Sequence, residues 1–446
     1  MRILEVLPTY PGDEFDGSAV YERNLNRALI ERGAHVEVLT TRAQRLRHVR
    51  QFSIKWPDEL PMDDEHDGVP IRRFHALDTG RAGDVVSDAV ARRWSREDFS
   101  DGEVLAGSAT FTEVGVDQAR RRPPRYDVLA DIGRGPLVPG LLMRLARQAS
   151  RFDVILAGYA PFSISRQVLW AASWSGVPVV LLPFIHESDR YHHFNSLLRT
   201  YERAAAVLTL SRHTTEFLHR HSPLANPVTL GAGVTTPASG SISAVEFRAR
   251  HNLEDRPVIL YVGRKEQGKR YDLAVAAVEA LPADALLVMV GRDVDGKVID
   301  SDRVRHLGTL STEELSAAYE ACDVFVLPSE FESFGMVFLD AWSRGKPVIG
   351  NAACGATAAL IEDGVDGFLC RDAGEIAAAA RRLIDNPELG ARMGAAGRAK
   401  TLADYTWERV GDRALDAFHD VAGGPSMTPL GLGSPRSPAR SRATRS

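Results

Sequence analysis

The stretch DVFVLPSEFESFGMVFLDAWSRGKPVIG, residues 323–350, predicts a strand, a loop, a helix and a second strand in succession. DVFVLPS is a β-branched apolar run that reaches Pro328, GMVFLDAWSRG has a helical pattern, and KPVIG is the next apolar run. Runs that are apolar on both faces and alternate with helices are typical of a parallel sheet covered on both sides. This stretch therefore predicts an α/β fold.

Similar runs occur in two groups along the chain. The first group comprises RILEVLP, AHVEVLTT, VPIRRFHA, FDVILAGY, VPVVLLPF and AVLTLS, and the second PVILYVG, ALLVMVG, VFVLPS, KPVIG and DGFLC. A chain of 446 residues exceeds one ordinary core, so the two groups predict two α/β domains. Between them TTPASGSISAV, residues 235–245, is small and polar enough for a linker.

The predicted organisation follows from these runs and from composition. We predict an N-terminal Rossmann-like domain over 1–235, a linker over 236–245, a C-terminal Rossmann-like domain over 246–405, a last helix over 406–422 and a disordered tail over 423–446. Residues 76–135 interrupt the alternation and are interpreted as an insertion. Long irregular segments are usually lids, binding loops or disorder, and the sequence does not choose among them.

Composition excludes several classes of protein. The hydrophobic fraction of 44%, the charged fraction of 25% and the net charge of −5 give no reason to expect a nucleic-acid partner. Three cysteines without CxxC spacing predict neither a disulfide framework nor a zinc site, which fits a reducing cytoplasm. No signal peptide and no apolar stretch of roughly 20 residues is found, so we expect a cytoplasmic protein that is not integral to a membrane.

Two acids flank the glycine of the opening stretch. Ligands of an open parallel sheet bind beyond the carboxyl ends of its strands, where the next helix begins with unpaired N–H groups. Glu332 lies in that loop, Gly335 permits close approach of an anion to the backbone, and Asp340 follows early in the helix. Because carboxylates repel phosphate, we expect the two acids to bind neutral hydroxyls, such as those of a sugar and a ribose.

These residues resemble a known family. PSEFESFGMVFLDAWSRGKPVIG is similar to the signature of the retaining glycosyltransferases of family 4, in which two Glu residues are separated by seven others. Here the pair is Glu332 and Asp340, so the second acid is one methylene shorter. The resemblance implies the GT-B fold, in which two Rossmann-like domains face each other and a C-terminal helix crosses back to the N-terminal domain.

Three further segments match the family in the expected order. YVGRKEQGKRYDLAVAAV resembles the segment whose Arg and Lys, here Arg264 and Lys269, neutralise the donor diphosphate. FDGSAVYERNLNRALIERGAHVEVLTTR resembles the first loop and helix, with Gly17 at the close approach to phosphate. VPVVLLPFIHESDRYHHF places His186 just past a strand, where the family has a histidine facing the donor sugar.

The resemblance implies a metal-independent, retaining glycosyltransferase that moves a sugar from a UDP- or GDP-sugar to an acceptor hydroxyl, without a cofactor. It assigns Glu332 to sugar hydroxyls and Asp340 to the ribose. The catalytic residues it implies are His186, Arg264, Lys269 and Glu332, and the donor-binding residues are Gly17, Gly335, Met336, Val337 and Asp340. The acceptor is left open as a small molecule, a glycan or a lipid-linked group. The alternatives are an epimerase or polymerising transferase on the same fold, and a nucleotide-sugar-binding protein without catalysis.

Other signals are given no functional role. Asp293 and Asp295 in GRDVDG form an Asp-x-Asp pair that could suggest a metal, but a polar, solvated turn is favoured, as it is for the acidic run at 62–68. No metal site is predicted. The Arg and aromatic content of the 76–135 insertion suggests a role on the acceptor side or in weak contact with the inner membrane face, and the Arg-bearing tail allows similar contact.

Overall fold

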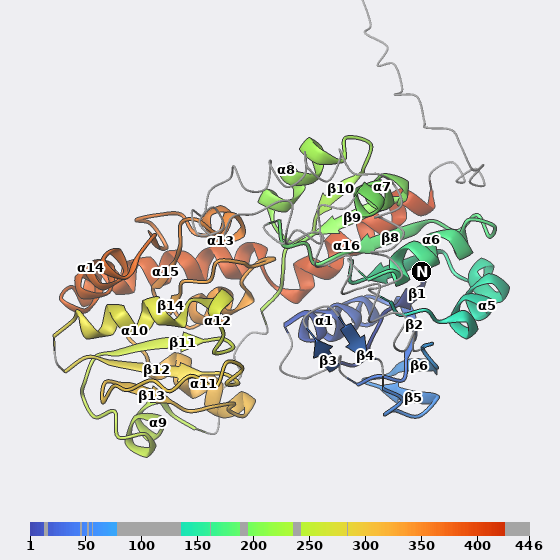
Figure 1. Ribbon diagram of the computed structural model, residues 1–446. Coiled ribbons are helices and arrows are strands. Elements are labelled where there is room, and N and C mark those ends of the chain that lie inside the picture. Colours follow the sequence, from blue (N-terminus) through green and yellow to red (C-terminus); the bar gives the residue numbers. More distant parts are fainter. Residues whose placement is uncertain are drawn as a thin grey trace, which may run out of the picture.

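The computed structural model describes two lobes, each built on a parallel sheet (Figure 1). The residues described are 1–12, 17–44, 47–50, 53–55, 57–77, 135–160, 162–187, 195–234, 242–282 and 284–423. Nearly all of the predicted insertion, the tail after residue 423 and most of the predicted linker lie outside them.

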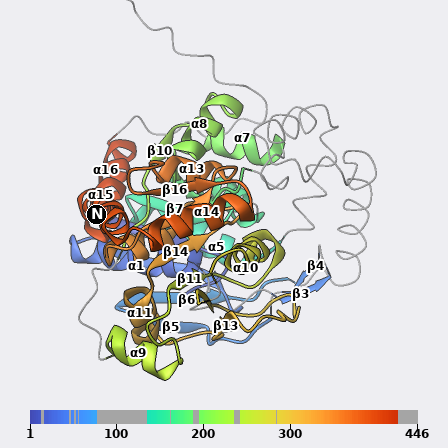
Figure 2. The same cartoon turned by 90° about the vertical axis from the view of Figure 1, so that its left-hand side faces the viewer.

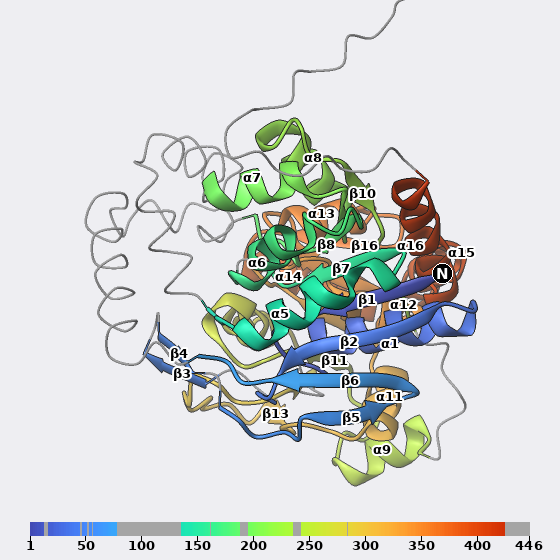
Figure 3. The same cartoon turned by 90° about the vertical axis from the view of Figure 1, so that its right-hand side faces the viewer.

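The first sheet belongs to the N-terminal lobe and is parallel except at one edge. Its strands, in spatial order, are β10 (Pro227–Thr229), β9 (Ala206–Thr209), β8 (Val179–Leu182), β7 (Val154–Gly158), β1 (Arg2–Val6), β2 (His35–Thr41), β6 (Val69–Phe74) and β5 (Asp63–His66). A separate hairpin pairs β3 (Arg47–Arg50) with β4 (Ser53–Lys55). Figure 3 shows this lobe from the side on which α5 and α6 lie.

Helices cover both faces of the first sheet, because its strands alternate between two apolar cores. In β7, Val154 and Leu156 join one core, and Ile155 and Ala157 join the other. The helices of this lobe are α1 (Gly17–Glu31), α5 (Pro139–Gln148), α6 (Ile164–Ala172), α7 (Asn195–Arg203) and α8 (Arg212–His221). Apolar residues of α5, α6 and α7 pack in the core to which Ile155 contributes, and those of α1 pack in the other.

The second sheet is parallel throughout (Figure 2). Its strands, in spatial order, are β13 (Val304–His306), β12 (Leu286–Val290), β11 (Val258–Val262), β14 (Val324–Leu327), β15 (Val348–Asn351) and β16 (Gly367–Cys370). Its helices are α9 (Ala244–Arg250), α10 (Tyr271–Glu279), α11 (Thr312–Ala321), α12 (Met336–Ser343), α13 (Gly355–Leu360), α14 (Ala373–Ile384) and α15 (Pro387–Asp404). The α/β architecture predicted from the alternating runs is thus confirmed.

The last helix, α16 (Trp407–Ala422), returns to the N-terminal lobe (Figure 1). It packs against α1, where the ring of Trp407 lies 5.2 Å from that of Tyr21. The Thr406 side chain caps its first turn, and Arg32 of the N-terminal lobe pairs with Asp412 at 2.5 Å. The chain therefore crosses between the lobes a second time, as the predicted fold class requires.

The acidic run at 62–68 contradicts one expectation, because it contains an edge strand in place of a solvated loop. β5 pairs antiparallel with β6, and the register places Asp63 opposite Arg72. Arg72 binds Asp63 and Arg73 lies 2.9 Å from Asp64, so the carboxylates are matched by cross-strand cations. Acidic residues are poor strand formers alone, and here the partner strand supplies the compensation.

No helix among the described residues is long and apolar enough to span a membrane.

Candidate functional site

The loop after β14 ends at a glycine that starts α12. Gly335 has φ +93°, a left-handed conformation that favours glycine, and a Cβ there would lie 2.8 Å from the Phe338 ring. No side chain caps α12. The first N–H groups of a helix have no partner within the helix, so those of Met336 and Val337 are suited to bind an anion. Both residues pack their side chains against the core, which leaves only their backbones for this task.

Glu332 and Lys269 meet in front of this helix. Lys269 Nζ lies 2.7 Å from Glu332 Oε1. The side chain of Lys269 is 18% exposed and that of Glu332 is 11% exposed. Lys269 ends a 3-10 turn and precedes Arg270, whose φ of +48° turns the chain into α10. The Arg270 guanidinium donates to Glu330 at 2.8 Å. Sequence reasoning missed this second pair, for which the charges of GKR and SEFE are the only signal.

Arg264 is not part of this ion pair. Its guanidinium lies 2.9 Å from Glu266 and is half exposed, and its carbonyl accepts a hydrogen bond from the Tyr261 hydroxyl at 3.0 Å. The structure therefore brings Lys269 and Glu332 together, and leaves the Arg264 side chain outside that pair.

His186 joins the two lobes at the site. It follows β8, and its Nε2 lies 3.2 Å from the Ser333 hydroxyl, which neighbours Glu332 in the loop. Ser333 was not singled out from the sequence, because only the placement of one lobe against the other brings it to His186. The contact puts the predicted histidine next to the predicted acidic loop.

Gly17 begins α1 directly across from α12. A Cβ at Gly17 would lie 3.5 Å from the terminal methyl of Met336. Two helix N-termini, one from each lobe, therefore approach each other beside the Lys269–Glu332 pair. The electropositive ends of both helices favour an anionic ligand between them. His192 and His193, which follow His186 in the sequence, lie outside the described residues.

Asp340 lies one turn into α12 and is partly exposed. Desolvation by the surrounding protein raises the pKa of its carboxyl to about 6, and the positive charge of Arg344 counters part of that rise. No hydrogen bond to its carboxylate is found in the described part of the chain, whereas its carbonyl accepts bonds from Ser343 and Arg344. The carboxylate is thus available to a hydroxyl of a ligand.

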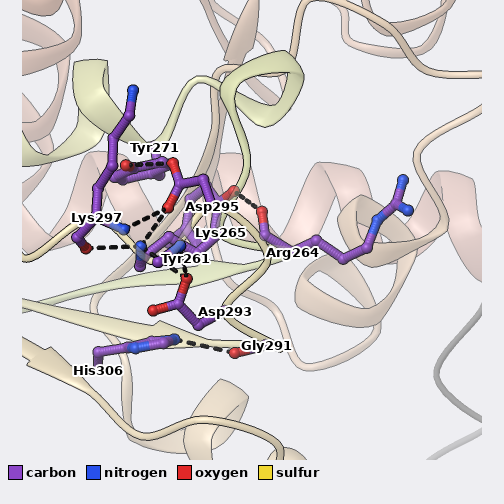
Figure 4. Close-up of polar contacts among 10 residues, drawn as sticks. Tyr261, Arg264, Lys265, Tyr271, Gly291, Asp293, Asp295, Lys297 and His306 are labelled. Carbon is purple, nitrogen blue, oxygen red and sulfur yellow. Dashed lines mark hydrogen bonds and ion pairs between the residues drawn. The ribbon is translucent and has the colours of Figure 1, made fainter. Parts of the chain in front are cut away.

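The Asp-x-Asp pair holds a lysine (Figure 4). Lys265 Nζ lies 2.8 Å from Asp293 and 2.5 Å from Asp295, and also donates to the Lys297 carbonyl at 2.8 Å. Asp295 accepts a further hydrogen bond from the Tyr271 hydroxyl, at 2.7 Å. We call these five residues the Lys265 cluster. We expected a solvated turn here, but the two aspartates form ion pairs with a lysine that is only 2% exposed. The contact forms because β11 and β12 are neighbours and end side by side.

The Lys265 cluster shifts the ionisation of its members. The Lys265 ammonium and its hydrogen bonds hold the pKa of Asp293 and of Asp295 below the ordinary value. The Arg264 side chain points away from the cluster (Figure 4). Among the described residues, no group of three or more His, Cys, Asp or Glu side chains is arranged to hold a metal ion.

A hollow of about 210 Å³ lies elsewhere between the lobes. Its walls include Ser211, Gly231, Phe334, Tyr405 and Arg413, and none of the predicted site residues lines it. Ligand pockets for molecules of drug size begin near 300 Å³. The hollow is therefore distinct from the candidate site and small for a nucleotide sugar.

Comparison with known proteins shows what the chain is similar to. Residues 244–400 match the family model described as glycosyl transferases group 1. The α-D-kanosaminyltransferase of Streptomyces kanamyceticus is 30% identical over 240 residues, which cover 49% of this chain and 61% of that relative. The chain matches between 36% and 61% of the length of the curated relatives compared.

Solved structures share the fold over almost the whole chain. Sucrose-phosphate synthase of Thermosynechococcus elongatus superimposes with a TM-score of 0.63 at 20% identity, covering 95% of this chain and 100% of that one. HepE of Anabaena, solved in complex with UDP and glucose, gives a TM-score of 0.63 at 16% identity, with coverage of 94% and 100%. At these identities the likeness concerns the fold, and it confirms the predicted GT-B architecture.

Proposed function

We propose that this chain, whose residues 244–400 match the family model described as glycosyl transferases group 1, transfers a sugar from a nucleotide diphosphate sugar to an acceptor hydroxyl. The observation that carries the proposal is the Lys269–Glu332 pair, held beside the N-terminus of α12 and across from Gly17. The site combines a cation and helix N–H groups, which suit a diphosphate, with carboxylates, which suit hydroxyls.

Each group has a task in the proposed complex. Lys269, Arg264 and the N–H groups of α12 bind the diphosphate, and Glu332 binds sugar hydroxyls. Lys269 neutralises Glu332 in the free protein. Binding of the diphosphate would draw the ammonium toward phosphate and release the carboxylate for the sugar. Asp340, whose carboxylate has no hydrogen-bond partner among the described residues, binds the ribose.

The reaction exchanges one bond at the anomeric carbon for another. The bond to the diphosphate oxygen breaks, the acceptor oxygen bonds to the anomeric carbon on the same face, and the acceptor proton passes to the departing phosphate. Negative charge grows on the diphosphate as its bond breaks. Fixed cations and helix dipoles stabilise that charge more in the transition state than in the ground state.

Donor binding can be measured without knowing the acceptor. We expect one class among UDP, GDP, ADP and TDP sugars to raise the melting temperature of the purified chain, with or without EDTA, because a ligand that binds only the folded state stabilises it. The variant E332A should show a smaller shift with the sugar nucleotide but a similar shift with the nucleoside diphosphate.

A matched control is E313A, which removes an acid from the first turn of α11. Its shifts should equal those of the wild type. The absence of a shift with every nucleotide sugar would count against the proposal, and a shift abolished by EDTA would replace metal independence with a metal-assisted site.

A further inference from the structure

Two tryptophans lie exposed on the N-terminal lobe. Trp170 in α6 and Trp174 just after it are 56% and 69% exposed, with ring centroids 5.0 Å apart in an edge contact. Met143 on the neighbouring helix α5 is 56% exposed. Aromatic side chains of this size normally bury most of their surface, so an exposed pair points to a contact made outside the chain.

Met143 and Trp170 belong to two helices that contact each other. α5 and α6 pack against each other and insert Leu141, Leu145 and Val168 into one core. The opposite sides of the two helices are therefore the exposed ones. There Arg144 and Arg147 of α5 are exposed beside Met143. We call Met143, Arg144, Arg147, Trp170 and Trp174 the α5/α6 surface.

The α5/α6 surface is positively charged although the chain carries a net charge of −5. Neither α5 nor α6 contains an acidic residue, and Arg151 adds a further exposed cation after α5. The next acid, Asp153, accepts a hydrogen bond from the backbone of Arg2 at 2.6 Å. The surface therefore favours an anionic partner.

We propose that the α5/α6 surface docks the protein on an anionic lipid bilayer. Tryptophan rings settle at the level of the headgroups, where the ring is shielded and the indole N–H stays hydrated. Arginines beside them bind lipid phosphates, and their apolar stems lie along the interface. Basic helices that carry large apolar side chains on their outer face are typical of such interfacial contacts. This inference does not depend on the transferase activity.

The position of the surface suits docking without hindrance to the C-terminal lobe. α5 and α6 lie at the end of the molecule far from α10 and α14, and they face the viewer when that end is turned forward (Figures 1 and 3). A bilayer on this side contacts the N-terminal lobe alone. The second sheet and its candidate donor site remain clear of the lipid.

Vesicle flotation of the full chain tests the proposal. Wild-type protein is expected to float with phosphatidylcholine vesicles that contain phosphatidylglycerol and to be released by high salt. Its tryptophan fluorescence should move to shorter wavelength on binding. W170S/W174S should lower the apparent partition coefficient by roughly tenfold or more, and R144Q/R147Q should lower it by roughly tenfold for anionic vesicles only.

Matched controls separate docking from general effects. V245S removes a side chain that is 77% exposed in the other lobe, and R381Q removes an arginine that is 65% exposed there. Both should float like the wild type, as should the donor-site variant E332A. Unchanged flotation of folded W170S/W174S would overturn the proposal. So would a wild type that ignores vesicles but self-associates through the tryptophans in sedimentation, because the surface would then bind a second copy.

Discussion

Lys265 and Lys269 stand four residues apart in one segment, and both reach carboxylates, but their surroundings differ. Lys265 is 2% exposed and has three oxygen acceptors, from Asp293, Asp295 and the Lys297 carbonyl. Lys269 is 18% exposed and binds one carboxylate, that of Glu332. The next residue after Glu332, Ser333, contacts the other lobe.

The difference separates two uses of the same side chain. An ammonium group has three donors. In Lys265 all three are matched by protein oxygens, so this lysine joins the loops after β11 and β12. In Lys269 one donor is matched by Glu332 and no other oxygen acceptor is found among the described residues, so this lysine is suited to bind a ligand. Exposure and the number of acceptors, rather than proximity to a motif, distinguish the two roles.

The largest effect is expected from replacing Lys269, and it tests whether this lysine differs from Lys265 in its role. K269A should lower the rate at which nucleoside diphosphate is released from the donor by about 10²–10³-fold, the usual cost of losing one group that stabilises developing charge. The melting temperature of the free protein should also fall, because the Glu332 carboxylate, only 11% exposed, is left without this cation. Both are measured on the same preparation.

K297A is the matched lysine control, since only the carbonyl of Lys297 binds Lys265 and its side chain is exposed. Its release rate should equal that of the wild type. A K269A protein that releases nucleoside diphosphate at the wild-type rate would remove Lys269 from the donor site.

Replacement of Lys265 should act on stability and leave the donor-site residues in place. K265M keeps the length of the side chain but leaves Asp293 and Asp295 without their cation, so we expect a melting temperature lower by roughly 5–10 °C. The triple variant K265M/D293N/D295N should recover most of this loss, because the uncompensated charges are gone. Thermal unfolding of the three proteins is the measurement, and a K265M protein as stable as the wild type would show that the cluster does not need its lysine.

Much of the fold could be predicted because its signals are local. The segment from β14 to α12 contains its own strand, glycine turn and helix within 28 residues, and the order of apolar runs predicted the parallel sheets. The fold class was therefore accessible from the sequence alone. The residues of the donor site could be nominated from the same segments, and their roles stay predictions.

What the sequence could not supply depends on pairings between distant segments. The Lys265 cluster forms only because β11 and β12 are neighbours, which brings residue 265 to residues 293 and 295. The strand at Asp63–His66 needed the arginines of β6, and the contact of His186 with Ser333 needed both lobes in place. Exposure of Trp170 is likewise a property of the packed helices. In each case the deciding partner is absent from the local pattern.

Asp340 is a third ionisable group of the same lobe, and it extends the comparison of the two lysines. Its replacement is expected to have the smallest effect of the changes considered. Desolvation raises the pKa of its carboxyl from the ordinary value of 3.8 to about 6 in the folded protein. The folded state therefore binds the proton more tightly than the unfolded state. Protonation of Asp340 therefore adds to the free energy of unfolding. This contribution is fully present below pH 3.8 and is lost as the pH rises through 6.

D340N removes that titration, so the difference in melting temperature between wild type and D340N should change between pH 4 and pH 6 and be constant above pH 7. The exposed Asp420, changed to Asn, is the control. Donor affinity of the wild type should rise over the same range, because the ionised carboxylate accepts the stronger hydrogen bond from a ribose hydroxyl. If affinity were equally independent of pH in both proteins, Asp340 would contribute to packing alone, and the ribose would have to be bound by another group of this lobe.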